Sequence, residues 1–305
     1  MGLIFIFIDG LGIGPEASEN PLDQSWNGFE LFAGEKLTAE SFRVDVNDYR
    51  VVKPIDANLG VDGLPQSGTG QTSLFSGENA ARLLGRHHGP YPHTKIKPLL
   101  GTPSIFGKAK QMGFNCHFMN AYPDRFFEYA EKHNRWSCTT KMCIDNGIDL
   151  NREADVREDR AITAEIFQDI WQKRLNIDLP DIDENTAAKR LISAADHYDL
   201  ILYEYYLTDK AGHEKNAGNA EEALTRISKL LQALYTRVNQ SKHTVLICSD
   251  HGNVENLSVK THTRNLVPLM VYGKGAGKFK NAESLTDVTP AILDWLNTFC
   301  NPGRP

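Results

Sequence analysis

Residues 3–10 read Leu-Ile-Phe-Ile-Phe-Ile-Asp-Gly, an unbroken apolar run that stops at an aspartate and a glycine. A strand that is apolar on both alternating faces is typical of a parallel sheet covered by helices on both sides. The run is too short for a membrane span and no basic residue precedes it, so it predicts a buried strand. Asp9 therefore follows the carboxyl end of a strand, where open α/β sheets bind their ligands.

The same pattern returns late in the chain. Residues 200–203 lead to Asp209, residues 244–248 lead to Asp250, and residues 266–271 follow His262. Helical periodicity covers residues 104–112, 185–197, 221–238 and 287–296, and a strand-like stretch covers residues 114–119. Strands that alternate with helices predict an α/β fold with a mainly parallel sheet sandwiched by helices.

Residues 122–183 interrupt this alternation. They are rich in charge and include helix-like stretches such as residues 160–173. We interpret them as a small cap inserted into a core formed by residues 1–121 and 184–305, an arrangement that suits a chain of 305 residues. Residues 301–305, Asn-Pro-Gly-Arg-Pro, predict a frayed tail.

Charge and cysteine content limit the classes of partner. A net charge of -6 argues against a nucleic-acid partner, which requires a clustered basic face. No stretch is long and apolar enough to predict a membrane partner. The five cysteines include no CxxC pair, so they predict neither a disulfide framework nor a zinc knuckle and favour a cytoplasmic location. A small anionic substrate would then need bound metal ions.

Four separated segments supply side chains that bind divalent cations: Asp9; Asp209 with His213; Asp250 with His251; and His262. The spacing of Asp209 and His213 puts both on one face if residues 208–213 form a helical turn. Mixed carboxylate and imidazole ligands suit zinc, manganese or iron better than calcium. Each segment alone has an ordinary alternative as a cap, a turn or a solvated imidazole. Their coincidence at one edge of the sheet predicts a centre for two metals.

Residues 65–77, Pro-Gln-Ser-Gly-Thr-Gly-Gln-Thr-Ser-Leu-Phe-Ser-Gly, offer a nucleophile. Small residues followed by a helical run predict a tight loop that enters a helix, whose free N–H groups can hold a phosphate. The alternative is a flexible loop rich in glycine and serine. A nucleotide-binding P-loop is not expected, because no Gly-Lys-Ser/Thr follows.

Several of these segments resemble the cofactor-independent phosphoglycerate mutases of the alkaline phosphatase superfamily. Residues 250–255, Asp-His-Gly-Asn-Val-Glu, are similar to the DHGN(A)E segment of that family, and residues 262–269 are similar to its HTxNxVP segment. Residues 209–213 resemble its DxxGH motif, Asp9-Gly10 its first metal aspartate, and residues 285–293 the terminal DVxPTxL helix of the superfamily. The family's serine lies ten residues before a glycine, which here selects Ser67 from Gly77, with Thr69 as the alternative.

The resemblance implies an alkaline-phosphatase-like core and two divalent metal ions, with manganese or zinc expected. Asp209, His213 and His262 would hold one ion, and Asp9, Asp250 and His251 would hold the other together with Ser67. Ser67 would attack a small phosphate ester and pass the phosphoryl group to water or to a second hydroxyl. The expected activity is that of a metal-dependent phosphatase or phosphomutase. The resemblance does not extend over residues 122–183, and Gln71 stands where the mutase segment has histidine.

Asn120 and Arg125 follow a predicted strand and are expected to bind substrate by overhanging the site. The alternative for Arg125 is a surface ion pair with Asp124 or Glu128, and His87 and His88 are expected only to line a turn. Two other functions stay open: a phosphodiester or phosphonate hydrolase of the same superfamily, and a non-catalytic metal-binding scaffold. A sulfatase is not expected, because Ser67 lacks the proline and arginine of the C/S-x-P-x-R motif.

Overall fold

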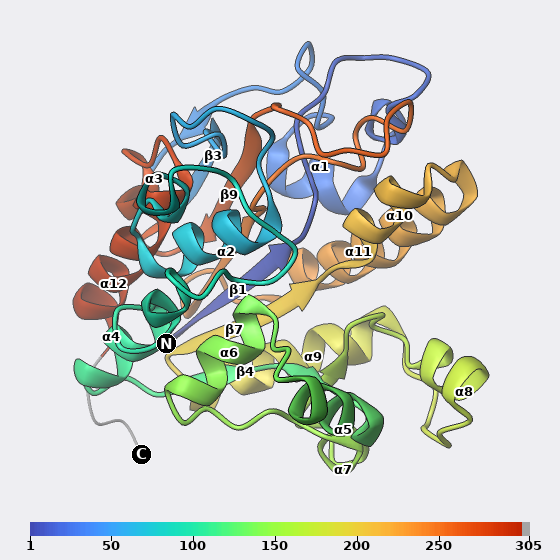
Figure 1. Ribbon diagram of the computed structural model, residues 1–305, viewed down its shortest axis with the longest axis vertical. Coiled ribbons are helices and arrows are strands. Elements are labelled where there is room, and N and C mark those ends of the chain that lie inside the picture. The colour runs from blue at the N-terminus through green and yellow to red at the C-terminus, as the bar shows by residue number, and fades with distance from the viewer. Residues whose placement is uncertain (301–305) are drawn as a thin grey trace.

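The computed structural model describes residues 1–300, and its centre is a seven-stranded sheet with the order β2-β3-β9-β8-β1-β7-β4 (Figure 1). The strands are β1 (Gly2–Ile8), β2 (Asp45–Val46), β3 (Arg50–Ile55), β4 (Cys116–Phe118), β7 (Leu200–Tyr205), β8 (His243–Cys248) and β9 (Val267–Gly273). The pairs β4–β7, β7–β1 and β1–β8 are parallel, whereas β9 runs antiparallel to β8 and β3. Since β3 opposes β9, it points the same way as the four parallel strands, which confirms the predicted mainly parallel sheet. The tail predicted at 301–305 lies outside the described residues.

Helices cover both faces of the sheet, and the alternation of β1 explains why. Leu3, Phe5 and Phe7 lie in one buried cluster, and Ile4, Ile6 and Ile8 lie in the other. The first cluster contains side chains of α2 (Ser67–Ser76), α3 (Ala80–Leu84), α4 (Ile105–Gln111), α6 (Cys138–Asp145) and α12 (Val288–Phe299). The second contains side chains of α1 (Asn27–Ala33), α9 (Glu184–His197), α10 (Leu207–Glu214) and α11 (Ala217–Arg237). The continuous apolar run of β1 is therefore buried between two helical layers.

Residues 122–183 form short elements beside the lower end of the sheet in Figure 1. These are α5 (Asp124–His133), α6, α7 (Glu153–Arg157), α8 (Asp169–Leu175) and β6 (Ile162–Thr163), which pairs with β5 (Asn120–Ala121). The helix predicted over residues 160–173 is wrong for its first half, because Ile166 and Gln168 have positive φ angles that a helix interior does not adopt. α6 packs against α2, and its Cys138 and Met142 belong to the core cluster. The division into core and inserted cap stays a prediction.

Parallel pairing brings the carboxyl ends of β1, β7 and β8 to one edge of the sheet. In register, Ile8 lies beside Tyr205, and Phe7 lies beside Cys248. Because β9 runs in the opposite direction, the residues before it reach the same edge. The loops that follow residues 8, 205 and 248 are consequently neighbours of one another and of the segment that leads into residue 267. Within residues 1–300, no helix is long and apolar enough to cross a membrane.

Candidate metal centre

The edge where these strands end gathers every predicted metal ligand. Asp9 follows β1 directly, and its backbone N–H donates to Tyr205 O at 2.9 Å. Asp209 and His213 lie on α10, whose bounds fit the helical turn that their four-residue spacing predicts. Asp250 and His251 follow β8, and His262 lies in the connection to β9. Ser67 is the first residue of α2, as expected for a loop that enters a helix.

Three side chains converge on one nitrogen atom of a fourth residue, His251 Nε2. Ser67 Oγ lies 3.0 Å from it, Asp9 Oδ1 lies 3.3 Å from it, and Asp250 Oδ2 lies 3.4 Å from it. All four residues are buried. The structure thus brings together the group that the sequence assigns to one ion, although nothing in the pattern of residues alone required Ser67 to reach it.

A second group lies beside the first. Asp209 Oδ2 is 3.4 Å from His213 Nε2, Asp209 Oδ1 is 3.5 Å from His262 Nε2, and the two histidine Nε2 atoms are 3.1 Å apart. The other ring nitrogens are fixed by backbone carbonyls, His262 Nδ1 by Pro65 O at 2.7 Å and His213 Nδ1 by Lys260 O at 2.8 Å. Such bonds fix the ring orientation and leave Nε2 free to bind a metal.

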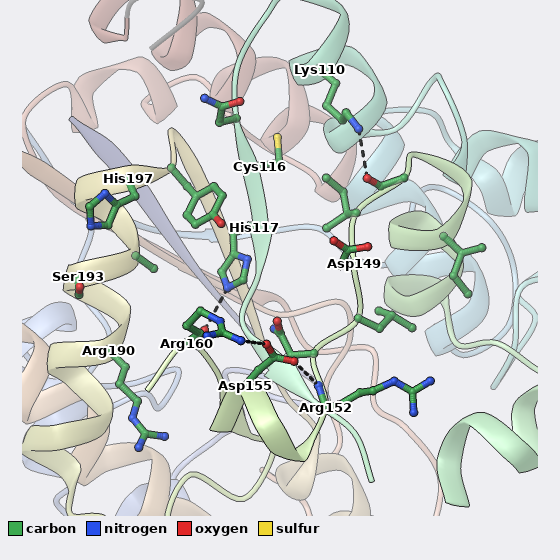
Figure 2. Close-up of a pocket in the computed structure, with 18 of the residues that line it drawn as sticks. Lys110, Cys116, His117, Asp149, Arg152, Asp155, Arg160, Arg190, Ser193 and His197 are labelled. Carbon is green, nitrogen blue, oxygen red and sulfur yellow. Dashed lines mark hydrogen bonds and ion pairs between the residues drawn. The ribbon is translucent and has the colours of Figure 1, made fainter. Parts of the chain in front are cut away.

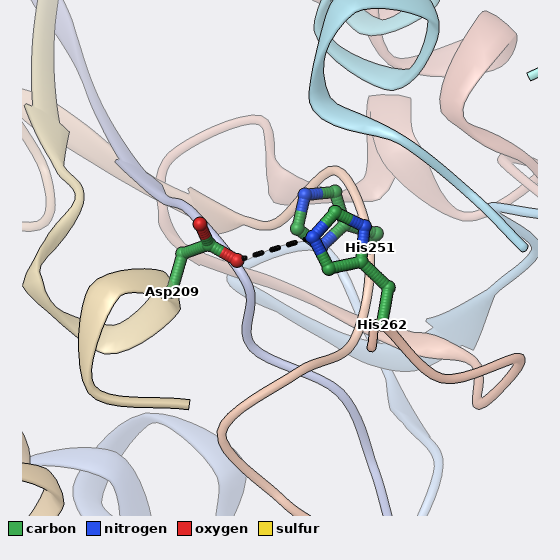
Figure 3. Close-up of side chains that lie close together, drawn as sticks. All are labelled: Asp209, His251 and His262. Atoms are coloured by element: carbon green, nitrogen blue, oxygen red, sulfur yellow. Dashed lines mark ion pairs between the residues drawn. The ribbon is translucent and has the colours of Figure 1, made fainter. Parts of the chain in front are cut away.

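The two groups lie next to each other, with His251 between them. Figure 3 shows Asp209 facing the rings of His251 and His262, which overlap. Ligand atoms of Asp209, His251 and His262 lie within 4.8 Å of one another, and so do those of Asp9, Asp250 and His251. His251 therefore stands between two clusters, each with oxygen and nitrogen donors of the kind that zinc and manganese accept.

Unpartnered atoms test whether the first group fits a cation. Asp9 Oδ1 and Asp250 Oδ2 are buried side-chain oxygens with no hydrogen-bond partner, and both face His251. Burial, followed by the charges of Asp250 and Asp209, raises the pKa of Asp9 well above its usual value. Burial and then the charge of Asp209 raise the pKa of Asp250 to about 8. Buried carboxylates without a counter-charge are costly, so the residues fit a bound divalent cation.

The imidazole groups differ in their protonation. Burial, followed by the nearby His262, lowers the pKa of His251 to about 3, and burial also lowers the pKa of His262. The hydrogen bond with Asp209 raises the pKa of the partly exposed His213 to about 9. Burial alone would raise the pKa of Asp209, but the bond from His213 is among the effects that lower it to about 2. Neutral His251 and His262 present lone pairs at neutral pH, as metal ligation requires.

Glu255 connects the loops that carry the ligands. One of its carboxylate oxygens accepts from Gly12 N at 3.0 Å and Asn253 N at 2.7 Å, and the other accepts from Asn265 Nδ2 at 3.1 Å and from the Thr263 hydroxyl. Its side chain is 1% exposed. Glu255 lies within residues 250–255, but the sequence pattern predicts no role for it; the structure makes it the link between the loops after β1, after β8 and before β9.

Other polar residues around the ligands have no role predicted from the sequence. Gln71 Nε2 donates to Asp9 Oδ2 at 3.0 Å, Asn253 Nδ2 donates to Asp209 Oδ1 at 2.6 Å, and Thr208 Oγ1 donates to Asp9 O at 2.6 Å. Glu204, in β7, accepts from Thr139 Oγ1 at 2.6 Å, and burial raises its pKa to about 7. The sequence feature that could have indicated Glu204 is its position as a single acidic residue in an otherwise apolar strand.

The two candidate nucleophiles differ in their surroundings. Thr69 is fully buried, and its hydroxyl oxygen lies 3.1 Å from Gln66 O and 3.4 Å from His88 O, the two carbonyls that can accept its single hydrogen. Ser67 Oγ instead faces His251. Thr69 therefore stabilises the start of α2, and Ser67 is the hydroxyl that meets the candidate ligands.

The two predicted substrate contacts, Asn120 and Arg125, do not belong to the cluster of candidate metal ligands. Both ends of the Asn120 amide pair with the backbone of Glu204, Nδ2 with its carbonyl at 2.7 Å and Oδ1 with its N–H at 2.8 Å. At 1% exposure, Asn120 joins β5 to β7 through both ends of its amide, and a contact with substrate stays a prediction. Arg125 lies exposed in the first turn of α5, and its role as a substrate contact stays a prediction.

A cavity of about 1120 Å³ lies away from this centre, at the outer edge of β4 (Figure 2). Several of its charged groups are paired with one another or with the backbone: Asp155 accepts from Arg152 N and from Arg160, Arg190 pairs with Asp159, and Lys110 donates to Asn146 O. None of the predicted ligands lines it. Size alone therefore does not identify the functional site of this chain.

Comparisons with known proteins agree with the geometry. A family model described as the Metalloenzyme superfamily matches residues 175–299. A 2,3-bisphosphoglycerate-independent phosphoglycerate mutase of Desulforudis audaxviator is 31% identical over 124 residues, which cover 38% of this chain and 24% of that relative. The enzyme of the same description from Pyropia yezoensis is 29% identical over 209 residues, or 61% of this chain and 38% of that relative. The matches thus span well under half the length of these relatives.

Solved structures match over nearly the whole chain. The alkaline phosphatase from the Antarctic bacterium TAB5 is 12% identical, with 98% of each chain covered and a TM-score of 0.57. The PH0037 protein from Pyrococcus horikoshii is 14% identical, with 97% of this chain and 96% of that chain covered and a TM-score of 0.58. At such identities these likenesses concern the fold.

Residues 175–299 thus match the model of the Metalloenzyme superfamily, and the fold of nearly the whole chain is like that of an alkaline phosphatase. In sequence the chain resembles the 2,3-bisphosphoglycerate-independent phosphoglycerate mutases.

Proposed function

We propose that the chain is a two-metal phosphoryl-transfer enzyme, a phosphatase or phosphomutase, that acts on a small phosphate ester through a phosphoserine at Ser67. One observation carries the proposal: Ser67 Oγ and the unpartnered oxygens of Asp9 and Asp250 all lie within 3.4 Å of His251 Nε2. A hydroxyl beside two buried, unpartnered carboxylate oxygens is an unfavourable arrangement unless a cation joins them. The neutral imidazole between them would complete the ligand set.

The proposed ligands keep the assignment made from the sequence. Asp209, His213 and His262 hold one ion, and Asp9, Asp250, His251 and Ser67 hold the other, with manganese or zinc as the expected metals. When bound, such ions lower the pKa of a coordinated hydroxyl and stabilise charge on phosphoryl oxygens. Ligand atoms of Asp209, His213 and His262 lie 3.1 to 3.5 Å apart. This spacing suits ligands that surround one ion.

The first turn of α2 contributes backbone donors. The first hydrogen bond within α2 is donated by Thr69 N to Gln66 O at 3.1 Å. The amides of Ser67 and Gly68 precede it and, together with the positive end of the helix dipole, are available to an anion. A phosphate at Ser67 would thus meet the metal ligands on one side and the helix start on the other.

The reaction follows from these positions. Ser67 Oγ loses its proton and forms a bond to phosphorus, while the ester P–O bond breaks and its electron pair stays on the alcohol oxygen, which takes up a proton. A water molecule or a second hydroxyl then attacks the phosphoserine, the Oγ–P bond breaks, and Ser67 recovers a proton. Water as acceptor gives a phosphatase, and a substrate hydroxyl gives a phosphomutase. The proposed substrate is a small soluble phosphate ester, and the proposed location is the cytoplasm.

Acid-quenched turnover tests the nucleophile. Wild type, Ser67→Ala and Thr69→Ala are assayed with sugar phosphates and 4-nitrophenyl phosphate in manganese or zinc, and quenched samples are searched for phosphoserine by peptide mass spectrometry. Ser67→Ala is expected to lose at least about 10³-fold in kcat and the phosphopeptide, whereas Thr69→Ala keeps the phosphopeptide. Full turnover by Ser67→Ala would refute the proposal. Two bound metals without turnover of any monoester, diester or phosphonate would instead support the scaffold alternative.

A further inference from the structure

One face of α2 lies along β1 and leads to the candidate metal ligands. Ser67, Gln71 and Phe75 are spaced four residues apart in this helix, so their side chains share a face. The ring of Phe75 meets that of Phe7, in β1, edge to face with centroids 5.3 Å apart. One turn earlier, Gln71 Nε2 donates to Asp9 Oδ2 at 3.0 Å. The face that carries the proposed nucleophile therefore also carries a donor to a proposed metal ligand.

Close packing holds α2 against the loops that carry the ligands. A Cβ atom on Gly70 would lie 2.8 Å from Asp250 O, so a residue with a side chain there would push α2 away from the loop after β8. Gln71 itself is only 4% exposed. In the part of the chain that the structure describes, no other side-chain amide or hydroxyl donates to the Asp9 carboxylate. Asp9 Oδ2 therefore depends on Gln71 for its side-chain donor.

The carboxylates of Asp9 and Asp250 are each held at one oxygen and open at the other. In Asp9, Oδ2 accepts from Gln71, while Oδ1 has no partner. In Asp250, Oδ1 accepts from Gly10 N at 3.4 Å, while Oδ2 has no partner. The two open oxygens lie 3.3 and 3.4 Å from His251 Nε2. The donor to Asp250 belongs to the backbone, but the donor to Asp9 is a side chain that a substitution can remove.

We propose that Gln71 is a positioning residue that reserves Asp9 Oδ2, so that Asp9 offers its ion one oxygen, Oδ1, instead of two. The inference rests on the proposed function, since it takes the Asp9 group, defined as Asp9, Asp250, His251 and Ser67, as the ligands of one ion. A carboxylate held in this way leaves room among the ligands for a substrate oxygen, as catalytic metal sites require. Partners that orient a ligand without touching the ion also strengthen metal binding.

Glutamine suits this position because its amide donates a hydrogen bond and carries no charge. A carboxylate that holds a cation can only accept, so the amide nitrogen must face Asp9. A lysine or arginine in its place would also donate, but the positive charge would repel the ion and reduce its affinity. Ser67 lies one turn before Gln71 on the same helix, so the bond also fixes Asp9 relative to the proposed nucleophile.

Calorimetric titration of the metal-free protein with manganese tests this role and needs no turnover. Gln71→Met removes the donor and nearly keeps the length of the side chain. In the His262→Ala background, which lacks a ligand of the other ion, it should weaken binding to the Asp9 group by about 10- to 100-fold. In the Asp250→Asn background, which lacks a ligand of the Asp9 group, it should change the affinity for the other ion by less than about twofold. Gln71→His keeps a ring N–H donor and should lose less affinity than Gln71→Met.

Ser76→Ala is the matched control, since Ser76 is also fully buried on α2 and its hydroxyl donates to Thr72 O at 2.7 Å, within the helix. It should leave both affinities within about twofold. If metal-free Gln71→Met does not fold, Gln71→Asn takes its place, because it keeps the amide but withdraws it by one carbon. Unchanged affinity at the Asp9 group, or equal losses for both ions, would overturn the role of Gln71. A wild type that binds no ion, or full turnover by Ser67→Ala, would reject the proposed function instead.

Discussion

The imidazole rings of His251 and His262 lie face to face, with centroids 3.8 Å apart and planes inclined by 12°. One belongs to the loop after β8 and the other to the connection before β9, and the proposed assignment gives each to a different ion. The stacking fixes the two groups side by side. Two ions held there would act on the same phosphoryl group, as two-metal phosphoryl transfer requires.

Metal content should separate the two groups. We expect two equivalents of manganese or zinc in the wild type, one in Asp209→Asn or His262→Ala, and one in Asp250→Asn, because each change removes ligands from one group. Elemental analysis after dialysis measures this. His133→Ala, an exposed histidine on α5, should keep both equivalents. Two full equivalents in the Asp209 and Asp250 variants would contradict the assignment.

The metal-free protein should become less stable as the pH rises from 7 to 9. The pKa of Asp250 is raised to about 8, chiefly by burial, and that of His213 is raised to about 9 by its bond with Asp209. Both groups therefore hold more protons folded than unfolded in this window, and their stabilisation is lost as they deprotonate. Asp250 alone accounts for on the order of 1 kcal/mol per pH unit below its pKa.

Other titrations at the centre do not reverse this trend. The pKa of His251 is lowered to about 3 and that of Asp209 to about 2, so both have titrated below the window. Thermal unfolding in EDTA should therefore show a falling Tm from pH 7 to 9. Added manganese or zinc should abolish the fall, since the cation replaces the lost protons. A metal-free Tm that rises over this range would rule the explanation out.

Glu255→Ala should weaken both stability and metal binding. It leaves the N–H groups of Gly12 and Asn253 without their buried acceptor and releases Thr263 and Asn265. We expect a loss of about 3 kcal/mol or more in the free energy of unfolding and weaker binding of both ions. Denaturant melts and metal titrations measure the two effects. Glu40→Ala, which removes an exposed acceptor of Glu16 N, is the matched control and should change neither markedly.

Asn120→Ala should act through stability rather than through substrate affinity. The variant loses two buried hydrogen bonds to the Glu204 backbone, at an expected cost of about 1 to 3 kcal/mol. After correction for the folded fraction, KM should stay near the wild-type value. Arg125→Ala tests the other predicted contact, and a rise in KM without a change in Tm would support it. A large selective rise in KM for Asn120→Ala would show that this interpretation of the amide is wrong.

Much of the fold followed from periodicity. The apolar run before Asp9, the late strands before Asp209 and Asp250, and the helices between them lie within a few residues of their predicted bounds. The strands are buried on both faces and the helices bury one face, so hydrophobic pattern alone specifies them. The cap was less predictable, because residues 160–168 turn through positive φ angles that no periodicity indicates.

The centre was predictable as far as side-chain chemistry and strand ends allow. Asp9, Asp250 and His251 meet because parallel strands end at a common edge, and His262 joins them because β9 is reversed. Contacts between loops were not predictable in this way. The bonds of Glu255 and the pairing of Asn120 with Glu204 depend on three-dimensional register, which single residues do not encode.

The central position of β1 bears on how the polypeptide acquires its ions during synthesis. β1 carries Asp9 and lies between β7 and β8, whose residues leave the ribosome about two hundred positions later, and His262 emerges later still. A growing polypeptide therefore cannot assemble either ion cage until almost all of the sheet exists, and structural cations add their binding energy only to the folded state. Bound ions would therefore stabilise only chains whose translation is complete, and truncated chains would lack this stabilisation.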